Sequence, residues 1–147
     1  MKKSVKTVLA LATALAWTGP IGAAITVNDD PVLFWNDLAV KTFGGNPLTQ
    51  SRAVAMVNTA MYDAVNRTYN GAGNYYNQNV AAPGGNVRAA ASVAAHDVLV
   101  AVDPAHAATY DMALASSLGL VGAGTAKENG KVTGAAYAAA MLARLRG

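Results

Sequence analysis

The chain has 147 residues, about the length of one domain, and it contains no cysteine, which excludes disulfide scaffolds and thiolate zinc sites. Its eleven lysines and arginines exceed its eight acidic residues by three, but Lys2, Lys3 and Lys6 account for this surplus. The rest is formally neutral, which argues against nucleic-acid binding, because that function keeps clustered bases on the folded body. Hydrophobic residues make up 53% of the sequence, too much for bulk disorder.

Residues 1–24 have the three-part layout of a secretory signal peptide. Three lysines precede the apolar run Val8–Trp17, and the small residues Gly22 and Ala24 then form a cleavage site, so we expect cleavage after Ala24. A membrane anchor is the alternative, but the apolar run is about half of the roughly twenty residues needed to span a bilayer. We therefore expect the mature chain to be secreted or periplasmic and to make no membrane contact.

The pattern of residues 25–147 predicts one all-α domain of about five helices in a bundle, because apolar residues recur at three- and four-residue steps and no strand pattern occurs. The predicted helices run from Pro31 to the break at Gly44–Pro47, from about Leu48 to Asn66, from Asn86 to Val102, from Asp103-Pro104 to about Leu118, and from Thr125 to about Arg144. Residues 68–85, rich in Gly, Asn and Tyr, predict a long loop.

Several local signals refine these helices. Asp30-Pro31 and Asp103-Pro104 each place a capping side chain before a proline, which is typical of a helix start. Thr125 and Glu128 have the spacing of a capping box. Asp63 and Arg67 lie one helical turn apart, so an ion pair between them is possible.

Gly130 and Gly134 lie within the last predicted helix, where each costs about 1 kcal/mol relative to alanine. Their spacing places both on one face, so they indicate the close approach of another helix. If the chain is part of a larger bundle, we expect this face to be exposed and to await the helices that are missing.

Only two histidines could bind a metal, and neither has a full set of partners. Asp103 and His106 are three residues apart and form one possible ligand pair, but a catalytic zinc site needs about three protein ligands. His96, beside Asp97, is interpreted as part of a polar helix face. We therefore predict no catalytic, cofactor-binding or metal-binding residue in this chain.

Three regions of the chain together resemble one protein family. They are Val32–Ala39 (VLFWNDLA), Ala55–Asn66 (AMVNTAMYDAVN), and Ala94–Val100 (AAHDVLV) followed by Pro104–Asp111 (PAHAATYD). In this order, after a signal peptide, they resemble the N-terminal helical region of secreted bacterial proteins of the vanadium-dependent haloperoxidase class, within the phosphatidic-acid phosphatase superfamily. The similarity covers nearly all of residues 30–147.

The resemblance implies an all-α fold in which a Lys, an Arg-Pro, a Pro-Ser-Gly-His and a Ser-Arg followed by a His hold vanadate or phosphate. Cations and backbone donors suit such an oxyanion, and histidine serves as axial ligand or nucleophile. These motifs do not occur here, and the only Ser-Arg pair, Ser51-Arg52, lacks the downstream pattern. What the resemblance transfers is the scaffold, with helix-packing and polar-network positions at Met61, Tyr62, Asp63, Val65 and Asn66.

Two hypotheses of function follow. In the first, the chain is the N-terminal scaffold portion of a haloperoxidase-like or acid phosphatase-like exported protein, is inactive alone, and forms half of a larger bundle. Its partner is then the missing C-terminal helical half or a second copy, and vanadate or phosphate is bound only by a full-length relative. In the second, the chain is a self-standing exported helical binding or interaction module.

Overall fold

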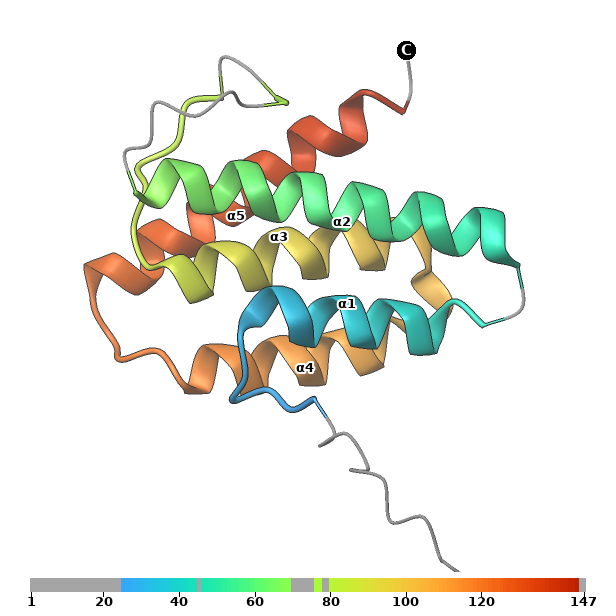
Figure 1. The fold of residues 1–147 in the computed structure, drawn as a ribbon. Helices are drawn as coiled ribbons and strands as arrows, with labels where there is room; N and C mark the ends of the chain where they lie inside the picture. The colour runs from blue at the N-terminus through green and yellow to red at the C-terminus, as the bar shows by residue number, and fades with distance from the viewer. Residues whose placement is uncertain (1–24, 45, 70–75, 78–79, 146–147) are drawn as a thin grey trace, which may run out of the picture.

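A computed structural model describes residues 25–44, 46–69, 76–77 and 80–145 of the chain. As predicted, the fold is all-α: within these ranges five α-helices and one 3-10 turn occur, and no strand. The elements are α1 (Pro31–Thr42), α2 (Pro47–Thr68), α3 (Val87–Val102), η1 (Pro104–His106), α4 (Ala107–Gly119) and α5 (Thr125–Ala143) (Figure 1). The predicted signal peptide and most of the predicted loop 68–85 lie outside the described residues.

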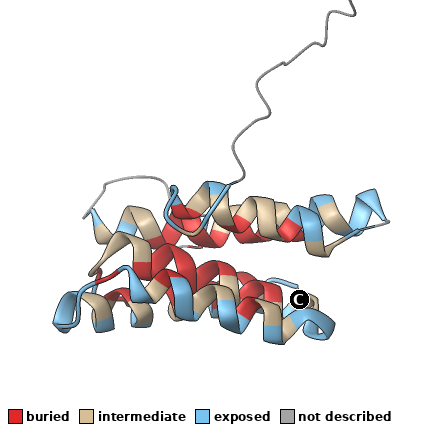
Figure 2. Ribbon diagram, turned by 90° about the horizontal axis from the view of Figure 1, so that it is seen from below, coloured by how far each residue is buried: buried red, intermediate tan, exposed pale blue. Residues whose placement is uncertain are grey.

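Helix α3 forms the centre of the bundle and contacts the other four α-helices. It is rich in alanine, and every residue from Ala89 to Ala95 is buried, so the helix is enclosed on several sides rather than along one face. Small side chains allow neighbouring backbones to approach closely, which explains how one helix serves four partners. Figure 2 shows the result, with buried residues along the inward sides of the helices and exposed residues outside.

Large buried hydrophobic side chains from all five helices join them into one core. Trp35 of α1, Met61 of α2, Leu99 of α3 and Tyr110 of α4 are each at most 1% exposed. Tyr137 and Met141 add the contribution of α5 to the same cluster. Burial of such side chains stabilises a fold by about 1.5–3 kcal/mol each, so this cluster determines how the helices are arranged.

The face of α5 that carries Gly130 and Gly134 is covered by α3, so the expectation that it awaits missing helices is wrong. Both glycines are buried. A Cβ atom added at Gly130 would lie 2.6 Å from the carbonyl oxygen of Asn86, and one at Gly134 would meet the carbonyl oxygen of Ala90. The glycines do indicate the close approach of a helix, as predicted, but that helix is part of this chain.

Asp30 and Asn86 begin α1 and α3 as predicted, whereas Asn46 was not predicted to cap α2, which begins at Pro47, one residue before the predicted start. The side chains of Asp30, Asn46 and Asn86 accept hydrogen bonds from backbone N–H groups of α1, α2 and α3, respectively. These bonds satisfy donors that have no partner within the helix.

The other two predicted starts are wrong in detail. Asp103 makes no capping hydrogen bond, and a 3-10 turn separates it from α4. The capping box does not form, because Thr125 is already helical and Gly124 occupies the capping position. Glu128 pairs with Lys131 instead, at 2.7 Å.

The described helices contain no segment that is both long enough and apolar enough to cross a bilayer.

Candidate functional site

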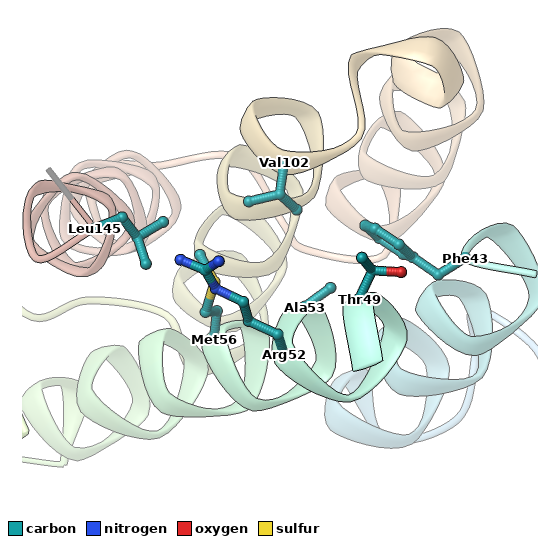
Figure 3. A pocket seen from close by; sticks show the side chains of 7 residues that line it. All are labelled: Phe43, Thr49, Arg52, Ala53, Met56, Val102 and Leu145. Atoms are coloured by element: carbon teal, nitrogen blue, oxygen red, sulfur yellow. The ribbon is translucent and has the colours of Figure 1, made fainter. Parts of the chain in front are cut away.

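A pocket of about 280 Å³ lies at the end of the bundle where α1 passes into α2. Apolar side chains form most of its wall, and Thr49 and Arg52 of α2 supply the polar groups. Figure 3 shows the seven lining residues: Phe43, Thr49, Arg52, Ala53, Met56, Val102 and Leu145. The pocket therefore draws on the ends of α1, α3 and α5 and on the first half of α2, and none of its lining residues carries a carboxylate.

Arg52 differs from the other basic side chains of the described residues. Two of those, Lys41 and Lys131, pair with a carboxylate on their own helix. The other four donate to backbone carbonyls or to an amide side chain; they are Arg67, Arg88, Lys127 and Arg144. Among the lysines and arginines of the described part of the chain, only Arg52 has no hydrogen-bond or ion-pair partner. Figure 3 shows that it extends from α2 toward Leu145.

A polar cluster centred on Asp103 includes the sequence neighbours of two lining residues, because Thr42 precedes Phe43 and Asp103 follows Val102. The Asp103 Oδ2 atom is 2.6 Å from the hydroxyl of Tyr110 and 2.7 Å from Nδ1 of His106. The Tyr110 hydroxyl is also 2.8 Å from Oγ1 of Thr42. Because a carboxylate only accepts, the phenol donates its proton to Asp103. The cluster thus joins α1, the α3–α4 connection and α4.

Burial and the neighbouring carboxylate both disfavour a phenolate at Tyr110. Desolvation is the larger cause and the hydrogen bond to Asp103 the second, and together they raise the pKa of this phenol far above its ordinary value. The tyrosine therefore stays protonated at any physiological pH, and its role is that of a hydrogen-bond donor between helices.

The structure brings the predicted pair Asp103 and His106 together, with a hydrogen bond to Nδ1 of the imidazole. The ring is about half exposed, and no described residue bonds to its Nε2 atom. This leaves one oriented imidazole nitrogen facing outward. No group of three potential metal ligands occurs among the described residues. The pair is thus a local contact, and the same Asp103 carboxylate oxygen is hydrogen-bonded to both His106 and Tyr110.

Both ring nitrogens of His96 have carboxylate partners, one on its own helix α3 and one on α4. Nδ1 is 2.7 Å from Asp97 and Nε2 is 2.8 Å from Asp111. Both nitrogens can donate only when the ring is protonated, and the hydrogen bond to Asp97, followed by that to Asp111, raises the pKa of His96 against the opposing effect of burial. With both nitrogens occupied, this histidine is neither a free base nor a free ligand, and it holds two helices together. His96 was predicted to lie on a polar helix face; its side chain is only 13% exposed and contacts α4, a partner that was not predicted.

Within the segment Met61–Asn66, Asp63 has the most extensive contacts. It is fully buried, and its carboxylate accepts from the backbone N–H groups of Tyr76 and Asn77 and from the Asn77 amide, at 2.8–2.9 Å. The possible ion pair with Arg67 does not form, because Nε of Arg67 donates to the carbonyl of Ala82. Tertiary partners have thus replaced the helical one.

The contacts of Asp63 continue to α5. Asn77 Oδ1 accepts from Nε of Arg144 at 2.9 Å, and the same guanidinium lies over the Tyr76 ring, 4.5 Å from its centre. Residues 76–77 therefore connect the C-terminal third of α2 to the end of α5. Of the five predicted scaffold positions, Met61 and Asp63 are buried, Val65 and Asn66 are half-buried, and Tyr62 is exposed.

Comparison with models of known protein families, with curated proteins and with solved structures finds no match to this chain.

Sequence reasoning did not identify the pocket, because its residues are dispersed over more than a hundred positions. Arg52 was noted only as half of the Ser-Arg pair. The contact of Tyr110 with Asp103 crosses the 3-10 turn, so helical spacing gives no signal for it. The contact of Tyr110 with Thr42, 68 residues away, has no local signal either.

What the site can do chemically follows from its composition. The hydroxyl of Thr49, the only one that lines the pocket, donates to the carbonyl of Asn46, and the lining includes neither a histidine nor a carboxylate to act as a base. An apolar wall with one free cation instead suits the binding of an anion.

Proposed function

We propose that residues 25–145 are the scaffold portion of an exported, haloperoxidase-like or phosphatase-like helical protein. The proposal is carried by the positions, in the fold, of the residues that give the resemblance. Trp35, Asp63 and Tyr110 come from its three regions, and all three side chains are fully buried. The resemblance therefore rests on residues that hold helices together.

The polar groups of these regions support the same conclusion, because they bind one another. Asn36 and Asn58 exchange two amide hydrogen bonds between α1 and α2, at 2.9 and 2.7 Å. His96 joins α3 to α4, and Asp103 binds Tyr110. Groups that are used in this way order the bundle. In this proposal the vanadate- or phosphate-binding groups belong to the part of a full-length protein outside residues 25–145, and the scaffold alone is inactive.

Activity measurements test the second half of the proposal. The purified chain is assayed with vanadate, peroxide and bromide, and separately with a generic phosphomonoester, next to a heat-treated sample of the same preparation. We expect equal rates in the two samples. Turnover that the heat-treated control lacks would show that the chain has a catalytic site of its own.

The first half is tested by the DNA that follows the codon for Gly147. An open reading frame there that encodes Arg-Pro, Pro-Ser-Gly-His, and Ser-Arg followed by His would support the scaffold proposal directly. If the DNA encodes none of these motifs, a complementing helical half must be sought as a separate chain, and failure to co-purify one would contradict the proposal.

The alternative, a self-standing exported binding module, is favoured by one specific observation. The pocket at Arg52 combines apolar walls with a cation that has no partner within the described residues. A self-standing module should be monodisperse and should melt cooperatively by itself. A scaffold that lacks half of its bundle should oligomerise, because it exposes apolar surface.

A further inference from the structure

We propose that the pocket at Arg52 binds a small amphiphilic carboxylate, a molecule with one carboxylate group and an apolar body. This inference does not rest on the scaffold proposal, and either can fail without the other. It is carried by the volume of the pocket, by its lining and by the unpaired charge of Arg52.

The volume sets the size of the ligand. Pockets for drug-sized molecules measure about 300–1,000 Å³, so a pocket of about 280 Å³ suits a smaller compound. Leu145, just beyond the end of α5, and Phe43, just beyond the end of α1, lie on opposite sides of the pocket (Figure 3). A molecule of a few carbon atoms in a chain or a single ring fits these limits.

The walls require an apolar body. Phe43, Ala53, Met56, Val102 and Leu145 present aromatic, thioether and aliphatic groups to the cavity. Ala53 and Met56 are themselves nearly fully buried, at 3% and 4% exposure, so the floor of the pocket belongs to the packed bundle. Apolar surface of this kind gains from contact with the hydrocarbon of a ligand, about 25 cal/mol for each Å² removed from water.

The charge of Arg52 determines the head group. A guanidinium presents paired N–H donors that match the two oxygens of a carboxylate. Asp103, which follows the lining residue Val102, is the acidic residue nearest in sequence to the lining. Its carboxylate is hydrogen-bonded to Tyr110 and His106 and does not pair with Arg52. The first turn of α2 contains no acidic residue, so the positive end of the helix dipole adds to the potential at this side.

A carboxylate fits better than a phosphate monoester because the described residues of the lining include a single cation. A phosphate carries close to two negative charges at neutral pH and presents three acceptor oxygens. One arginine balances one negative charge, so a phosphate here would retain an unbalanced charge against apolar walls, which is costly. Octanoate, with one carboxylate and a flexible alkyl chain, is therefore a suitable probe.

The test is a titration of the full chain with sodium octanoate, followed by calorimetry and by amide chemical shifts. We expect saturable binding at one site, with shifts at Phe43, Met56 and Val102. The substitution Arg52→Gln should weaken octanoate binding about tenfold or more, because it removes the charged partner of the carboxylate. Lys131→Gln removes the same charge on the outside of α5 and should leave the affinity unchanged.

A second pair of variants separates charge from shape. Leu145→Glu places a carboxylate at the rim and should weaken octanoate binding while it leaves the binding of 1-octanol nearly unchanged. Leu145→Gln, of the same size but neutral, should affect both compounds equally. Thermal melts of all four variants verify that each is folded, and because Arg52 and Leu145 are exposed, we expect melts close to that of the unsubstituted chain.

Three results would overturn the inference. The first is the absence of saturable octanoate binding to the folded chain. The second is that the unsubstituted chain and the Arg52→Gln variant bind octanoate with equal affinity, or that the unsubstituted chain binds octanoate and 1-octanol with equal affinity. Either outcome would show that the charge is not recognised. The third is a set of chemical shifts that maps to another part of the bundle.

Discussion

The Tyr110 hydroxyl donates a hydrogen bond to Asp103 at 2.6 Å, and this bond connects the first turn of α4 to the residue that follows α3. The ring of Tyr110 is fully buried, and its hydroxyl also meets Thr42 at the end of α1. One side chain thus holds three helices at the end of the bundle where the pocket lies, which makes it the first position to test.

Removal of the Tyr110 hydroxyl should destabilise the fold without creating a large cavity in the core. In Tyr110→Phe the ring remains, but Asp103 loses one of its two donors in a partly buried setting. We expect the free energy of unfolding to fall by about 1–3 kcal/mol, the range for a buried group that loses its partner. Urea denaturation measures this. Tyr62→Phe is the matched control, since Tyr62 is 54% exposed, and a change there larger than about 0.5 kcal/mol would show that phenol hydroxyls matter for another reason.

Stability should depend on pH through His96. Its pKa is raised in the folded state by Asp97 and Asp111, so the folded chain retains the proton at pH values at which the unfolded chain has released it. The stabilisation is therefore complete below about pH 6.5, the ordinary pKa of the unfolded side chain, and it is lost as the pH rises through the higher folded pKa. We expect the urea midpoint to fall between pH 6 and pH 9.

The substitution His96→Gln isolates this effect, because it removes the titrating group. The fall in the urea midpoint should become smaller in this variant and should persist in His106→Gln, whose ring is more exposed. An NMR titration in which His96 shows a pKa at or below 6.5 would contradict the prediction directly.

The buried carboxylate of Asp63 should be the most sensitive acidic group. It accepts three hydrogen bonds, and in Asp63→Asn an amide nitrogen would face donors in place of an oxygen. We expect a loss of about 3 kcal/mol, since a bond to a charged group is worth about 1.5–3 kcal/mol and more than one is affected. Chemical denaturation gives the value.

Asp37→Asn is the control for Asp63, because Asp37 pairs only with Lys41 one turn away on α1. Pairs of this kind contribute about 0.3–0.5 kcal/mol, so this variant should be nearly neutral. Equal losses for the two substitutions would mean that the contacts of Asp63 with residues 76–77 do not stabilise the fold.

Gly134→Ala should destabilise the bundle although alanine is the better helix former. The added Cβ would meet the carbonyl of Ala90 and lie 2.9 Å from the backbone nitrogen of Ala94, and neither backbone atom can move without a shift of α3. We expect a net loss of about 1–3 kcal/mol in thermal or urea unfolding, as for other overpacked cores.

Gly119→Ala provides the opposite case. Gly119 ends α4, and no atom lies within 4 Å of the position of its added Cβ. The substitution should be neutral or should stabilise by up to about 1 kcal/mol. If Gly134→Ala were as well tolerated, the close contact between α3 and α5 would not exist in solution.

The predictability of the candidate site differs from residue to residue. Asp103 and His106 are neighbours on one short segment, so their contact could be expected from spacing alone. The pocket could not, because Phe43 and Leu145 are about a hundred residues apart, and only the packing of α1, α2 and α5 brings them to one cavity. Arg52 is conspicuous only after every other basic side chain in the described part of the chain is seen to have a partner.

The sequence by itself determined the all-α class, the order of the helices and most of their ends, because helical periodicity and the caps at Asp30 and Asn86 act over a few residues. The tertiary structure alone decided the partners of polar groups. Asp63 bonds to residues 76–77 rather than to Arg67, and Asp103 bonds to Tyr110 rather than to the backbone of α4. The physical reason is that a buried carboxylate takes the donors that packing brings to it, and spacing along one helix carries no information about those.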